Sequence, residues 1–157
     1  MMGGGTAYHA SNRTCRTPGS LPGARVDVTL GDMGMTSMMN GDAPMGAQMR
    51  LRTSTTQVSA GEVSLVVSNL GWRTHELVIL PLGKGPAGQR AVGANGRVSE
   101  AGSLGEASRA CGPDAGEGIT SGSAGWTSIT LNPGRYELVC NLRNHYANGM
   151  RQALTVS

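Results

Sequence analysis

The sequence predicts an all-β domain, an antiparallel sandwich or barrel of short strands. Three observations lead to this prediction. Short segments of alternating apolar and polar residues are separated by turn residues along much of the chain. The 157 residues include 25 glycines, which disfavour long helices. No apolar run approaches the roughly 18 residues of a membrane-spanning helix, because the longest, Leu77–Leu80, ends at Pro81.

The polar residues 1–24 are expected to form a partly ordered N-terminal arm, and residues 25–157 the domain. Within the domain, a glycine-rich and methionine-rich loop is expected over 31–47 and a turn over 58–61. Seven segments combine alternation with β-branched residues and are expected to be strands. They are 26–30, 48–52, 62–67, 75–80, 127–131, 135–140 and 152–156.

Residues 81–125 form a long insertion with 12 glycines and little periodicity. Stretches of this length without secondary structure are uncommon inside a domain, so some contact is expected to hold it in place. Ser103-Leu104-Gly105-Glu106 fits a capping box, which predicts one short helix near 104–110.

Cys15, Cys111 and Cys140 are the three cysteines of the chain. Since Cys140 belongs to the motif described next, Cys15 and Cys111 are the natural disulfide pair in an oxidising compartment. The alternative is two unrelated buried thiols. No signal peptide is legible at the N-terminus, and this does not argue for the cytosol.

A group of metal-binding residue types lies near the C-terminus. Cys140, His145 and Met150 follow the spacing C-x4-H-x4-M between two expected strands, and His75 opens an earlier strand. Two imidazoles, one thiolate and a distant thioether form the trigonal site that copper uses in electron transfer. Gly149 lets the backbone turn so that Met150 approaches the metal. Each residue alone would more often be ordinary core, but the four together favour one bound copper ion.

These motifs resemble the cupredoxins, the small blue type 1 copper proteins, and in particular their sulfocyanin-like and related bacterial copper-binding members. The likeness covers roughly 26–157, with 81–125 as an insertion. It implies a cupredoxin-like Greek-key β-sandwich of about seven to eight strands. It also implies that His75, Cys140 and His145 are equatorial ligands and that Met150 is a weak axial ligand. Glu76 stands where many members have Asn, Ser or Thr, which leaves the hydrogen bonding of the sulfur open.

The segment 31–49 contains six methionines. A secondary Cu(I) site built from Met33, Met35, Met38 and Met39 would make the protein one of copper storage or delivery. The other interpretation is that these methionines fill an irregular core or form an apolar docking surface.

The net charge and the aromatic content of the chain bear on nucleic acid binding. The formal charge of +3 and the lack of phenylalanine do not suggest nucleic acid binding.

The resemblance implies that His145 is exposed at the edge of the molecule. A basic rim of Arg73, Arg143 and Arg151 would then surround it and attract an acidic redox partner. The alternative is that these are scattered, solvated arginines.

The expected function is therefore single-electron transport by a periplasmic, extracellular or outer-side membrane-anchored copper protein. An enzyme is not expected, because an oxidase or nitrite reductase needs more histidine-bound copper. After His75 and His145, only His9 is left.

Overall fold

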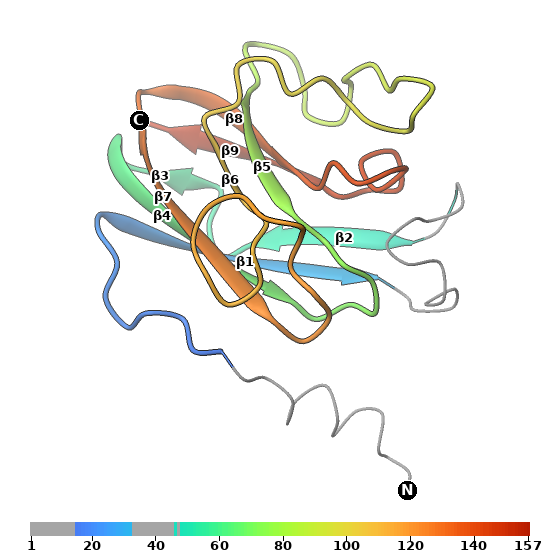
Figure 1. Ribbon diagram of the computed structural model, residues 1–157. Helices are drawn as coiled ribbons and strands as arrows, with labels where there is room; N and C mark the ends of the chain where they lie inside the picture. The colour runs from blue at the N-terminus through green and yellow to red at the C-terminus, as the bar shows by residue number, and fades with distance from the viewer. Residues whose placement is uncertain (1–14, 33–45, 47) are drawn as a thin grey trace, which may run out of the picture.

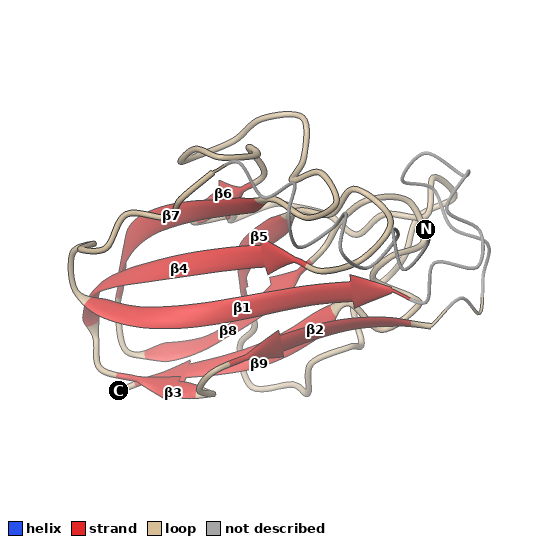
Figure 2. Ribbon diagram, turned by 90° about the horizontal axis from the view of Figure 1, so that it is seen from below, coloured by secondary structure: helices blue, strands red, loops and turns tan. Residues whose placement is uncertain are grey.

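Two β-sheets packed against each other make up the structure, a computed structural model that describes residues 15–32, 46 and 48–157 (Figure 1). The first sheet has the order β2-β1-β4-β7 and the second β3-β9-β8-β5-β6. Figure 2 shows β1 and β4 side by side in one layer, with β8 and β9 in the other. The strands are β1 (Ala24–Asp32), β2 (Met49–Thr53), β3 (Gln57–Val58), β4 (Gly61–Asn69), β5 (Leu77–Pro81), β6 (Gly105–Ala107), β7 (Ala124–Leu131), β8 (Gly134–Val139) and β9 (Arg151–Val156).

The predicted all-β sandwich and its seven strands are confirmed, but the purely antiparallel pairing is wrong. The described residues contain nine strands. The two that the sequence did not predict are β3 and β6. These have two and three residues, too few to show a period. β1 pairs in parallel with β4, and β3 with β9. Pairing direction depends on how distant segments meet, which local alternation does not record.

The main core lies between the sheets. On β1, Val26, Val28 and Leu30 are buried, while Asp27 and Thr29 between them face solvent. This alternation is the pattern that predicted the strand. The inward-facing residues of both sheets join in a single apolar cluster.

The long insertion covers the outer face of the second sheet. A second apolar cluster joins Val78, Leu80 and Val139 of that sheet to Val98 of the insertion and to Tyr146. β5 is therefore buried on both faces, which explains why Leu77–Leu80 reads as a continuous apolar run instead of an alternation.

A buried carboxylate on β8 holds the insertion in place. Glu137 is fully buried and accepts hydrogen bonds from the Gly88 amide at 2.7 Å and from the Tyr146 hydroxyl at 2.9 Å. Arg90 Nε pairs with the same carboxylate at 2.6 Å. A charge of this kind is tolerated only when it is paired and hydrogen-bonded, so these contacts connect the insertion to the sheet.

Tyr146→Phe is expected to lower the free energy of unfolding by about 1.5–3 kcal/mol, because the buried charge of Glu137 loses a donor. Tyr136→Phe is the matched control, since its hydroxyl donates to a neutral carbonyl, that of Asn132. We expect about 0.5–1.5 kcal/mol there. Urea unfolding measures both losses, and an equal loss in the two variants would contradict the assigned role of Glu137.

The predicted helix near 104–110 is wrong. Residues 105–107 form β6, which pairs antiparallel with β5 from Leu77↔Ala107 to Ile79↔Gly105. A helix of this length gains little on its own, whereas the edge of β5 offers backbone partners to an extended segment. Within the described part of the chain, no helix is long and apolar enough to cross a membrane.

The predicted disulfide between Cys15 and Cys111 is present, with the two Cα atoms 5.0 Å apart. It connects the segment before β1 to the insertion. The Cys111 amide donates to the carbonyl of Ala124 at the start of β7, so the arm is fastened beside the first sheet.

Candidate metal centre

Strand ends and one tight loop position the predicted ligands. Cys140 directly follows β8 and Met150 directly precedes β9. The loop between them is closed by backbone hydrogen bonds from the Cys140 amide to the Met150 carbonyl and from the Met150 amide to the His145 carbonyl, both 3.1 Å. His75 precedes β5 and is held by a two-way backbone bridge with Ile119 of the insertion.

The side chains of His75, Cys140 and His145 converge in the buried interior. The two Nδ1 atoms lie 3.1 Å apart, and Cys140 Sγ lies 3.3 Å from His145 Nδ1 and 3.7 Å from His75 Nδ1. From these three distances, a point equidistant from the atoms would lie about 2.0 Å from each, which matches an ordinary metal–nitrogen bond and is about 0.3 Å shorter than a metal–sulfur bond. All three side chains are fully buried, so the triangle is already the size and shape of a metal site.

The thiol of Cys140 is protonated at neutral pH without metal. Burial, together with the nearby charge of Glu76, raises its pKa to about 12. The Glu76 amide lies 3.3 Å from Sγ and points its hydrogen toward the sulfur. A metal ion that binds here must displace the thiol proton, so its apparent affinity increases with pH.

Met150 is fully buried beside the other candidate ligands and belongs to the main core cluster. The backbone conformation just before Met150 depends on Gly149, whose φ of 118° is unfavourable for other residues. A Cβ at this position would come within 2.8 Å of the Met49 carbonyl oxygen of β2. The loop therefore passes close to the first sheet only because residue 149 is glycine.

Asp32 is a residue of this site that the sequence reasoning missed. Its carboxylate lies 2.7 Å from His75 Nε2, on the side of the ring opposite Nδ1. Burial by itself raises the pKa of Asp32, but hydrogen bonds from His75 and from the Arg73 and Trp72 amides outweigh it and hold the pKa well below its ordinary value. The alternation on β1 ends before Asp32, and no local pattern connects it to His75, 43 residues away.

Glu76 faces two other carboxylates, Glu106 and Glu100. Burial, with the charges of these two groups, raises the pKa of Glu76 to about 7, although a hydrogen bond from the Asn141 amide opposes the shift. Glu76 follows His75 and Asn141 follows Cys140, so this contact connects the two segments that carry the candidate ligands.

Glu76→Gln is expected to flatten the pH dependence of stability in the metal-free protein. Because folding raises the pKa of Glu76 from 4.5 to about 7, the folded state loses stability as pH rises through this range. The loss amounts to at most about 3 kcal/mol. Urea unfolding at pH 4.5 and pH 8 measures it. Glu62→Gln, on the exposed face of β4, is the control, and an unchanged pH dependence in Glu76→Gln would contradict the prediction.

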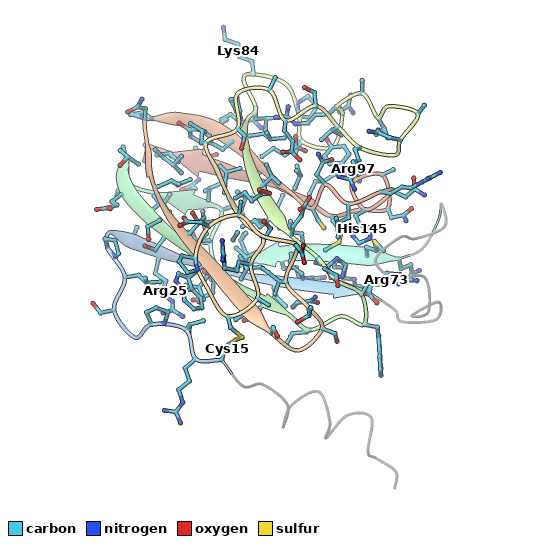
Figure 3. The ribbon with its side chains drawn as sticks, viewed as in Figure 1. Cys15, Arg25, Arg73, Lys84, Arg97 and His145 are labelled. Atoms are coloured by element: carbon cyan, nitrogen blue, oxygen red, sulfur yellow. A yellow bond between two sulfur atoms is a disulfide. The ribbon has the colours of Figure 1, made fainter. Side chains whose placement is uncertain are left out.

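The basic rim is only partly supported by the positions of its residues. Arg73 is 3% exposed and pairs with the buried carboxylate of Asp32, so its assignment to an exposed rim is wrong. Arg143 is exposed, and Arg151 is half-buried against Tyr146. His145 is fully buried, which corrects the expectation of an exposed edge ligand. Figure 3 shows Arg73, Arg97 and His145 at one end of the molecule, away from Cys15 and Arg25.

The predicted secondary Cu(I) site, formed by Met33, Met35, Met38 and Met39, lies outside the described residues.

Comparison with solved structures identifies the fold. The chain is similar to rusticyanin from Thiobacillus ferrooxidans, with 18% identity, coverage of 100% of this chain and 94% of that one, and a TM-score of 0.50. Auracyanin B gives 20% identity, coverage of 89% and 93%, and a TM-score of 0.51. Another structure, of the copper protein rusticyanin, gives 19%, coverage of 97% and 92%, and 0.50. The chain therefore has the cupredoxin fold. No protein-family model and no curated protein sequence matches it.

Proposed function

We propose that this protein is a mononuclear type 1 copper protein that carries single electrons. The observation that supports this most directly is the buried triangle of two imidazole nitrogens and one thiol sulfur. Thiolate suits Cu(I) and imidazole suits both oxidation states, so this donor set is the one expected for copper in electron transfer. When bound, the copper would supply reversible one-electron chemistry.

The protein's own residues would hold the donors in place through both oxidation states. His75, Cys140 and His145 would hold the copper, and Met150 would act as a weaker fourth ligand. The bridge of His75 to Ile119 and the closed loop after Cys140 fix the backbone on both sides. Little ligand motion would then oppose electron transfer. The likeness in fold to rusticyanin, described as a copper protein, supports the choice of metal.

The test is a visible and EPR spectrum of the Cu(II)-loaded protein. We expect an intense blue or green colour from sulfur-to-copper charge transfer and one copper per chain. A colourless Cu(II)-loaded protein would overturn the type 1 assignment.

Copper stoichiometry separates electron transport from storage or delivery. With one site, Cu(I) titration should saturate at one ion per chain, and simultaneous replacement of Met33, Met35, Met38 and Met39 should leave that value unchanged. A second equivalent of Cu(I) that disappears in the replaced protein would favour the storage or delivery function.

We also propose that the protein works outside the cytoplasm with a protein redox partner. The disulfide between Cys15 and Cys111 supports an oxidising compartment. The exposed Arg143 within the ligand loop supports a partner with an acidic surface, whose association rate would fall as salt is added.

A further inference from the structure

A carboxylate from the first sheet reaches a candidate ligand attached to the second. Asp32 ends β1, whereas His75 precedes β5. The Asp32 side chain is fully buried, and its Oδ2 lies 2.7 Å from His75 Nε2. Buried ionised carboxylates are costly unless they are paired, so this contact calls for a specific explanation.

The loop before His75 is built around this carboxylate. The Trp72 amide donates to it at 3.1–3.2 Å and the Arg73 amide at 3.1 Å, while Arg73 Nη1 lies 3.3 Å from Oδ1. These donors hold Asp32 ionised and fix its direction. The carboxylate is therefore oriented before any metal arrives.

Gly71 leaves room for the contact between Asp32 and His75. A Cβ on Gly71 would overlap Oδ2 of Asp32 and come within 3.0 Å of His75 Nε2. The Asn69 side chain holds this turn, because its Oδ1 accepts from the Gly71 amide at 2.9 Å. The Asn69-Leu70-Gly71 turn thus serves the carboxylate–imidazole pair.

The contact determines which nitrogen of His75 carries the proton. Asp32 accepts a hydrogen bond, so a neutral His75 has its proton on Nε2. Nδ1 then presents its lone pair toward Cys140 Sγ and His145 Nδ1, where the metal would sit. A carboxylate behind a ligating imidazole also increases the electron density that the ligand donates.

We propose that Asp32 is a positioning residue of the metal centre, which sets the tautomer of His75 and favours Cu(II) over Cu(I) through its negative charge. The second part rests on the proposed copper function. The first part concerns the metal-free protein and stands by itself. Arg73 partly offsets the charge, so the effect on the metal is that of a screened carboxylate.

Nitrogen-15 NMR of the histidines in the metal-free full-length protein tests the tautomer. We expect His75 to carry its proton on Nε2, with a strongly downfield Nε2–H signal. In Asp32→Asn this signal should move upfield or disappear by exchange with water. A wild-type His75 protonated on Nδ1 alone would overturn the proposal, whatever metal the protein binds.

Asp32→Asn tests the charge, because asparagine keeps nearly the same shape. We expect the Cu(II) dissociation constant to rise about 10- to 100-fold. The Cu(I) constant should rise less, so the reduction potential becomes more positive. Asp27→Asn is the matched control, since Asp27 lies on the same strand but is exposed and paired with Arg25. It should leave both constants unchanged.

Equal losses of Cu(II) and Cu(I) affinity in Asp32→Asn, with an unchanged potential, would assign Asp32 a purely structural role and overturn the proposal. If Asp32→Asn does not fold, Gly71→Ala provides a second route, because it displaces the carboxylate without removing it and should also make the potential more positive. A wild-type protein without the charge-transfer colour would refute the copper function and leave the tautomer measurement interpretable.

Discussion

Cys140→Ser is expected to abolish the sulfur-to-copper charge-transfer colour completely. Among the described residues Cys140 is the one free cysteine, and it provides the sulfur of the buried triangle. A serine hydroxyl is nearly the same size but remains protonated at neutral pH and is a poor ligand for Cu(I). The visible spectrum after Cu(II) addition measures the result, and equilibrium titration should show much weaker Cu(I) binding.

The metal-free form of the same variant is the control for folding. Because serine replaces the thiol with little change in volume, the free energy of unfolding without metal should change by no more than about 1–2 kcal/mol. Loss of colour in a folded protein then reports loss of the sulfur–metal bond. Retention of an intense band near wild-type strength would contradict the assignment of Cys140 as a ligand.

Removal of the disulfide in the double variant Cys15→Ser/Cys111→Ser is expected to lower the free energy of unfolding by about 4–5 kcal/mol. The bridge joins residues 96 apart and so restricts most of the unfolded chain. Urea unfolding should be measured without metal, because a ligand bound only to the native state adds its own stabilisation.

Copper should partly rescue the double variant. Figure 3 shows Cys15 away from His145, so the variant should keep the charge-transfer colour while its metal-free form unfolds at lower urea. A double variant with wild-type stability in the metal-free state would contradict the entropic role of the bridge.

Most of the strands could be predicted because their signal is local. A strand buried on one face needs alternating residues, and β1 and β2 carry that pattern. β3 and β6 could not be predicted because they are short. Each is stabilised by pairing with a neighbouring strand, β3 with β9 and β6 with β5. The helix expected near 104–110 failed for the same reason, since sheet pairing outweighed a weak local capping signal.

Part of the candidate metal centre could also be predicted from the sequence. The ligand spacing after Cys140 lies within a single loop, and His75 lies two residues before the apolar run of β5. The contact of Asp32 with His75 could not be predicted, because one aspartate after a predicted strand is usually a solvated turn residue. Arg73 was placed wrongly, since arginine is mostly exposed unless a buried carboxylate pairs with it.

The amino-acid sequence by itself determined the sandwich of strands, because the strands follow from residue types at short spacing. It also predicted the candidate donor residues and favoured the pairing of Cys15 with Cys111 over two unrelated thiols. Only the tertiary structure decided the parallel pairing of β1 with β4, the burial of His145 and the contact of Asp32 with His75. These depend on which distant segments meet when two sheets pack. Burying apolar faces selects that arrangement for the chain as a whole, and a local pattern does not contain it.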